Sequence, residues 1–229
     1  MKEINRQIGA KVPLASYFQI DMGFAFECNA LTKSGRLTYT VEISAQYPKT
    51  ISGYVNIDKY SEMCKLGCAN YGQKWSCPPY TPSFQDFATG WDRLYVFYMR
   101  IATAQFLYIK NDYLKIKAAN SVLKSRADRF LRMLTEQNGE FISTGSCRLC
   151  KPCKRKIGAI CAHPDKMTYS FEALGVDVAT LVNECFCDPL LWYKSGYLPE
   201  YTSVVCGLLI NESLSEKTLY NKYVKYIAH

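Results

Sequence analysis

The sequence predicts an α/β or α+β fold, in which a single mixed sheet is flanked by helices and carries two cysteine-rich cluster-binding loops, one of them ferredoxin-like. Runs that alternate β-branched and aromatic residues are interleaved with segments of helical periodicity. The chain has 229 residues, 48% of them hydrophobic, which is enough for an ordinary buried core. No repeat or low-complexity linker divides it, so we expect a single domain over residues 1–229, with cluster-binding segments at about 60–82 and 145–166.

The expected strands follow from alternation at period two or from short apolar runs bounded by turns. They cover residues 24–28, 37–44, 93–101, 140–144 and 203–210. Helices are expected from 83 to about 90, from 112 to about 137, as one or two short pieces within 170–183, and in the tail from 213. Basic residues lie between the apolar positions of the long helix, and we interpret them as a solvated face: Lys115, Lys117, Lys124, Arg126, Arg129 and Arg132.

The strongest motif runs from Cys147 through Cys150 and Cys153 to Cys161, with the spacing C-x2-C-x2-C-x7-C. Bacterial ferredoxins hold a [4Fe-4S] cluster with a similar run of three thiols at every third residue and a fourth further on. Zinc usually takes two separate pairs of ligands, which would leave one cysteine of this run over or shared. The motif therefore favours an iron–sulfur cluster, with zinc as the alternative.

A second cysteine group reads C-x3-C-x8-C and ends in Cys77-Pro78-Pro79. Cys64 and Cys68 are one helical turn apart, so they share a face, and Cys77 returns from a glycine-containing loop. We predict that Cys64, Cys68 and Cys77 bind a second metal or cluster. Several fourth ligands stay open: Cys185, Cys187, Cys206, Cys28, a bound substrate, or an exchange of roles between Cys77 and Cys161 as in two-cluster ferredoxins.

These two segments together resemble a family of small prokaryotic proteins described as predicted metal-binding proteins. The resemblance rests on the C-x3-C…C-P-P segment, on the C-x2-C-x2-C…C-x-H-P segment that ends at His163-Pro164, and on the following stretch from Ser170 to Val178. It covers residues from about 60 to 210. The resemblance implies metal binding and does not imply a particular reaction.

If both predictions hold, the protein binds one or two [4Fe-4S] clusters. A cluster held by four cysteines would transfer electrons, whereas a cluster held by three would leave one iron free to bind a small molecule. We therefore expect an iron–sulfur-dependent enzyme, an oxidoreductase or a lyase. The alternatives are an electron-transfer or accessory iron–sulfur protein and a zinc-stabilised binding module. No catalytic residue or substrate can be named from the sequence.

The composition also limits the location and the binding partners that the protein can have. The 11 cysteines form an odd number in a chain without an export signal, which favours reduced thiols and a cytoplasmic location over disulfides. The net charge of +8 is partly explained by the negative centre that thiolates around a cluster create, and no nucleic-acid-binding module is recognisable. No apolar run spans a membrane. We expect a small-molecule substrate or a redox partner protein, with no nucleic acid; the oligomeric state is not indicated.

Overall fold

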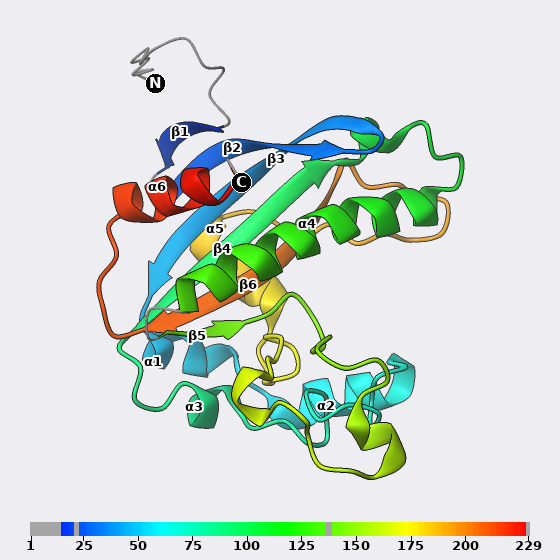
Figure 1. Cartoon of the computed structure of the whole chain (residues 1–229), viewed down its shortest axis with the longest axis vertical. Helices are drawn as coiled ribbons and strands as arrows, with labels where there is room; N and C mark the ends of the chain where they lie inside the picture. The colour runs from blue at the N-terminus through cyan, green and yellow to red at the C-terminus, as the bar shows by residue number, and fades with distance from the viewer. Residues whose placement is uncertain (1–14, 21–22, 136–138, 228–229) are drawn as a thin grey trace.

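The computed structural model describes residues 15–20, 23–135 and 139–227, and it consists of one sheet with helices on both faces (Figure 1). The strands are β1 (Ala15–Ile20), β2 (Gly23–Thr32), β3 (Gly35–Gln46), β4 (Arg93–Ala102), β5 (Gly139–Ile142) and β6 (Tyr201–Ile210). The helices are α1 (Pro48–Ile51), α2 (Ile57–Gly67), α3 (Phe84–Phe87), α4 (Asp112–Thr135), α5 (Val178–Phe186) and α6 (Glu216–Ile227).

The sheet has the strand order β1-β2-β3-β4-β6-β5, and the pairings between these strands are antiparallel. The prediction of a single sheet flanked by helices is thus confirmed in its α+β form, with antiparallel pairing in place of the expected mixed sheet. In an α/β sheet, a helix crosses over between two neighbouring parallel strands. The helices of the described residues do not make such crossovers, so neighbouring strands pair antiparallel. The sequence-predicted strands and the long helix all occur, although residues 136 and 137 of that helix lie outside the described part.

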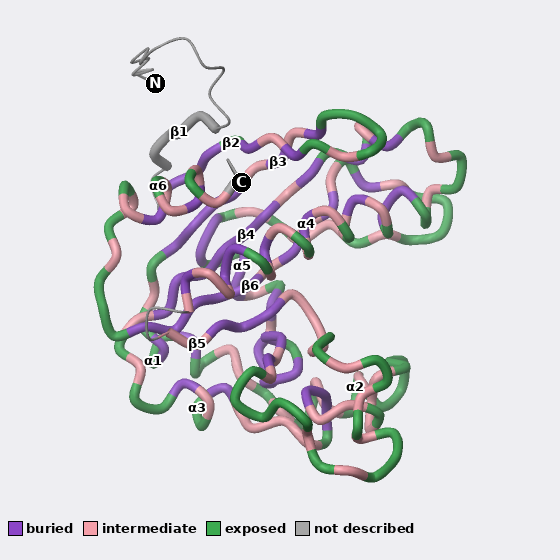
Figure 2. Tube along the Cα trace, in the orientation of Figure 1, coloured by how far each residue is buried: buried purple, intermediate pink, exposed green. Residues whose placement is uncertain are grey.

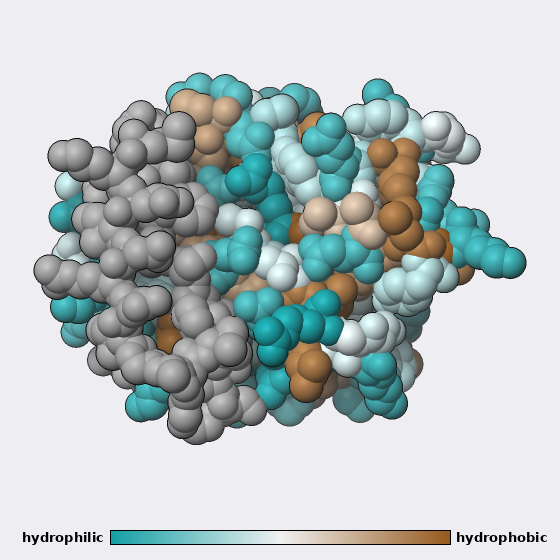
Figure 3. Space-filling view, turned by 90° about the horizontal axis from the view of Figure 1, so that it is seen from above, coloured by the Kyte–Doolittle hydropathy of each residue, from teal (hydrophilic) through white to brown (hydrophobic). Residues whose placement is uncertain are grey.

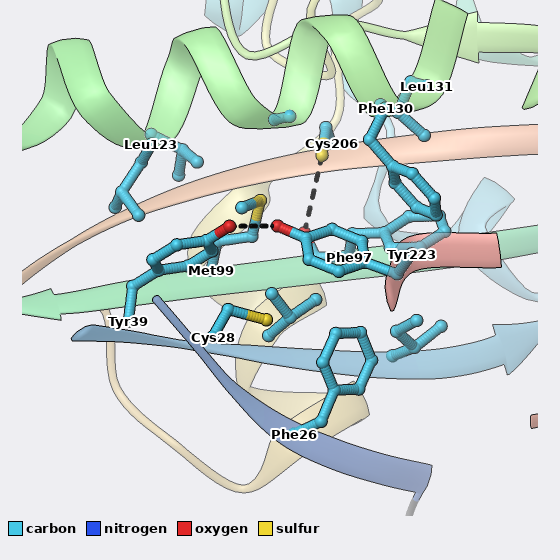
Figure 4. Close-up of a cluster of buried hydrophobic side chains, with 14 of the residues drawn as sticks. Phe26, Cys28, Tyr39, Phe97, Met99, Leu123, Phe130, Leu131, Cys206 and Tyr223 are labelled. Carbon is cyan, nitrogen blue, oxygen red and sulfur yellow. Dashed lines mark hydrogen bonds between the residues drawn. The ribbon is translucent and has the colours of Figure 1, made fainter. Parts of the chain in front are cut away.

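Alternation along the strands separates two cores. On β3, the side chains of Leu37, Tyr39, Val41 and Ile43 point to one face, where they are buried beneath α4 and α6. Figure 4 shows this core, including the hydrogen bond of 2.6 Å between the hydroxyl groups of Tyr39 and Tyr223. The opposite face is covered by α1, α3, α5 and the turns at 171–176. The molecule therefore has three layers with the sheet in the middle.

Surface polarity is mixed. In Figure 3, hydrophobic side chains form separate patches among hydrophilic ones on the face that is seen from above. Among the large hydrophobic side chains that the structure describes, Leu31, Leu66 and Ile160 are the most exposed. Within the described residues, no helix is both long and apolar enough to cross a bilayer.

Candidate metal centre

The two cysteine segments lie together outside the sheet, next to the β5 edge. In Figure 1, α2 and the segment that follows β5 form a lobe below the strands. Figure 2 shows that this lobe is mostly exposed or intermediate, whereas the strands are mostly buried. The ferredoxin-like segment begins at Cys147, five residues after β5 ends at Ile142. Both segments thus lie beyond the same edge of the sheet (Figure 1).

The four cysteines of the ferredoxin-like segment line one shared hollow. Each of them is partly exposed, and the Sγ of Cys161 lies 4.0 Å from the Sδ of Met167. The rest of the lining comes from Trp75, Ser76, Leu149, His163 and Met167. The structure therefore brings Cys147, Cys150, Cys153 and Cys161 around a shared space with partly apolar walls.

The donor set fits a metal cluster. Four thiols converge on one hollow, and thiolates are the ligands of iron–sulfur clusters and of structural zinc. Among the described residues, no three His, Cys, Asp or Glu side chains already lie close enough to bind one metal ion. The imidazole of His163, the histidine singled out in the sequence, lines the same hollow from an exposed position.

Cys64, Cys68 and Cys77 form a second group at the end of α2. Cys64 lies in the last turn of the helix, and the N–H of Cys68 caps it by donating to the carbonyl of Cys64 at 2.8 Å. Burial raises the pKa of Cys77 to about 11, and the nearby thiols of Cys68 and Cys64 contribute. Burial also raises the pKa of Cys64, with further contributions from Cys68 and Glu172. The three thiols thus lie within electrostatic range of one another, and a bound cation would reverse these shifts.

Polar contacts join the two cysteine segments. Ser76 is 1% exposed, and its Oγ accepts a hydrogen bond of 3.0 Å from the N–H of Cys147. The Nζ of Lys74 donates to the Oγ of Ser146 at 2.8 Å and to the carbonyl of Cys147 at 3.2 Å. The loop that contains Cys77 therefore holds the beginning of the other cysteine loop.

Aromatic packing makes a second connection. The Nε1 of Trp75 donates to the carbonyl of Ala159 at 3.0 Å, and the rings of Trp75 and Tyr80 meet edge to face with centroids 5.0 Å apart. The guanidinium of Arg155 lies over both rings, 5.4 Å and 4.5 Å from their centroids, and donates to the Tyr80 hydroxyl. These aromatic residues thus pack the two loops against each other.

A tight turn at Gly175 positions α2. Its φ of +83° is in the left-handed region, and a Cβ added there would lie 2.7 Å from the Cα of Ile57, the first residue of α2. The carbonyl of Gly175 accepts a 2.7 Å hydrogen bond from the N–H of Asn56, whose side chain caps α2 by accepting from the N–H of Lys59. Glycine is required here because both the backbone conformation and the close approach exclude a side chain.

The other four cysteines lie elsewhere. Cys28 and Cys206 are in the core beneath α4 (Figure 4), and burial raises the pKa of both thiols. Cys185 is buried in the opposite core, where burial raises its pKa to about 11 and a hydrogen bond with Ser44 lowers it. Cys187 is exposed after α5 with a φ of 51°. Among the described residues, none of these four is a group that shifts the pKa of Cys64 or Cys77, so the fourth ligand of that group stays a prediction.

Sequence reasoning did not single out Lys74, Ser76 or Lys124. The first two lie within three residues of Cys77, and only this proximity in the sequence could have indicated a role. Lys124 was placed on a solvated face of the long helix, yet it is half-buried, and Lys115 on the same helix is buried. Periodicity could not reveal this for Lys124, because the loop at Gly145 that lies beside it is distant in the chain, whereas Lys115 pairs with Asp112 of the same helix at 2.7 Å.

The fold and the site define an α+β protein in which two cysteine loops in contact are suited to hold metal. Residues 53–209 match the family described as predicted metal-binding protein (DUF2284), and the chain belongs to this family. The match spans more than half of the chain and includes both cysteine groups, so it confirms the resemblance drawn from the motifs. Comparisons with curated proteins and with solved structures found no match.

Proposed function

We propose that this metal-binding protein is an iron–sulfur protein, in which Cys147, Cys150, Cys153 and Cys161 hold one [4Fe-4S] cluster. The observation that carries the proposal is that these four thiols line one shared hollow. A Zn–S bond of about 2.3 Å would draw four sulfurs to within about 4 Å of each other around a single point. Four thiols that line one hollow, while no three ligands among the described residues meet at a single point, match a cluster with several irons better than one zinc ion.

We further propose that Cys64, Cys68 and Cys77 hold a second cluster with one position open to a small molecule. A closed cluster supplies one-electron transfer, and an open one also supplies Lewis-acid binding, so the proposed activity is that of an oxidoreductase or a lyase. The protein's own residues would hold and shield these groups. Trp75 and Met167 limit access of water, and the charges of Arg148 and Lys151 offset negative charge on the thiolates.

A second candidate function is electron transfer to a partner protein. It is favoured by the position of the cysteine segments near the surface, where Cys68 is exposed and the side chains of Ile157 and Ile160 are 69% and 85% exposed. In this case both clusters would be closed and no substrate would change their spectra. Either function would take place in the cytoplasm, which suits reduced thiols and oxygen-sensitive clusters.

The test is the iron, sulfide and zinc content of protein purified without oxygen, with absorption and EPR spectra. We expect about eight irons and eight sulfides per chain in the wild type. Cys150→Ala should lose one spectral component and Cys68→Ala the other. Cys187→Gly is the matched control for Cys68→Ala, because it removes another exposed thiol next to a helix end and glycine suits its positive φ. A colourless wild type with about two zinc ions, even after cluster reconstitution, would exclude the proposed function and favour a zinc-stabilised binding module.

A further inference from the structure

A second hollow lies beside the ferredoxin-like segment. One wall is the loop from Ser143 to Ser146, between the end of β5 and Cys147, and the other comes from α4, which contributes Lys124. The Nζ of Lys124 lies near the loop backbone, since a Cβ on Gly145 would be 3.9 Å away from it. The hollow is separate from the one that the four thiols line, although the two share the same loop.

The hollow has an excess of positive charge. Lys124 and Arg148 both line it, and neither forms an ion pair with any of the described residues. Burial lowers the pKa of Lys124, and the charge of Arg148 lowers it further, which shows that the two cations are close. Asp128 also belongs to the lining, but its carboxylate is paired with Arg132 at 3.3 Å. An anion between the two cations would relieve their repulsion.

The loop supplies hydrogen-bond donors to the same place. Among the described residues, no acceptor pairs with the backbone N–H of Thr144, Gly145 or Ser146. The Oγ of Ser146 accepts a hydrogen bond from Lys74, so its own proton is free to be donated. Consecutive free N–H groups in a turn form a concavity that binds anions, and cations and hydroxyl groups around it strengthen the binding.

We propose that this hollow binds the oxyanion group, a phosphate or a carboxylate, of the small-molecule substrate. The hollow adjoins the metal centre, because Ser146 and Arg148 line it while Cys147, which stands between them in the chain, lines the hollow of the four thiols. A substrate anchored by its anionic group at Lys124 and Arg148 would extend from there toward the metal centre. This role in positioning rests on the proposed function, whereas binding of the anion itself does not.

The experiment is calorimetric titration of anaerobically purified, metal-analysed protein with inorganic phosphate and, separately, with acetate. Ionic strength is kept constant with chloride. We expect saturable binding that weakens at least tenfold in Lys124→Met, which keeps the aliphatic chain and removes the charge. Lys117→Met is the matched control, because this exposed lysine of the same helix contacts only the ring of Tyr113, at 5.3 Å, among the described residues. Arg148→Met, on an exposed loop, repeats the test in case Lys124→Met fails to fold.

The outcomes separate the two proposals. Tighter binding of phosphate indicates a phosphate-bearing substrate, tighter binding of acetate indicates a carboxylate, and either supports the site. Absence of saturable binding of both anions by the wild type, or unchanged binding in folded Lys124→Met and Arg148→Met, overturns it. Zinc in place of iron together with retained anion binding would remove the iron–sulfur function and leave the anion site in place.

Discussion

Replacement of Gly175 by alanine tests whether the turn at 175 positions the helix that presents Cys64 and Cys68. The left-handed conformation costs an alanine roughly 1–2 kcal/mol. Its Cβ would also lie 2.7 Å from the Cα and 2.9 Å from the N of Ile57, well inside the optimal carbon contact of about 3.5–4.0 Å. Overpacking of this kind costs about 1–3 kcal/mol, because α2 must move. We therefore expect Gly175→Ala to lower the free energy of unfolding by roughly 2–5 kcal/mol.

Gly196→Ala is the control that separates the two costs. Gly196 has a φ of +79°, but no atom of the described residues lies within 4 Å of its added Cβ, so only the cost of the backbone conformation, about 1–2 kcal/mol, applies. The assay is denaturant unfolding of both variants, with metal content measured on the same samples. Equal destabilisation by the two substitutions, or full metal content at the Cys64 group in a destabilised Gly175→Ala, would refute the reasoning.

Three further changes have defined outcomes. Trp75→Phe removes the N–H that binds the carbonyl of Ala159 and should cost about 1 kcal/mol in unfolding experiments; an unchanged midpoint would mean that this bond does not hold the loops together. Burial raises the pKa of the Glu42 carboxyl above its ordinary value of 4.5, so the folded state binds this proton more strongly than the unfolded chain does. The free energy of unfolding should therefore fall as the pH rises from below 4.5 through the raised pKa. In Glu42→Gln the free energy of unfolding should depend less on pH in this range, and a slope identical to that of the wild type would contradict a raised pKa of Glu42. After chelator treatment, mass spectrometry should find new alkylation at Cys68, whereas Cys187 should react before and after; equal reactivity of Cys68 in both states would argue against metal there.

Much of the fold could be predicted because local patterns determine it. The apolar run of β4 and the spacing of Ile116, Leu123, Phe130 and Leu134 on α4 were sufficient to place these elements within a few residues. The direction of strand pairing could not be predicted, since it depends on which strands become neighbours after folding. The same sequence patterns suit parallel and antiparallel sheets.

The candidate site was predictable only in part. Both cysteine groups follow from spacing alone, but the contact between them depends on Lys74 and Ser76, which carry no motif. The hollow next to Lys124 combines a helix residue with a loop that starts 19 residues further along the chain, and no local signal relates them. Side chains that are brought together by tertiary packing become visible only in the structure.

The bond between Ser76 and Cys147 has a consequence for how the protein acquires its metals. Because this bond joins the two loops, ordering one loop also restrains the other. Metal binding at either cysteine group should therefore raise the metal affinity of the other group, and by the same factor whichever group binds first. A metal titration of Cys150→Ala would measure this coupling as weaker filling of the Cys64 group, and unchanged affinity would disprove it. With such coupling, partly loaded chains would be scarce, and maturation would proceed from empty to fully loaded protein almost in one step.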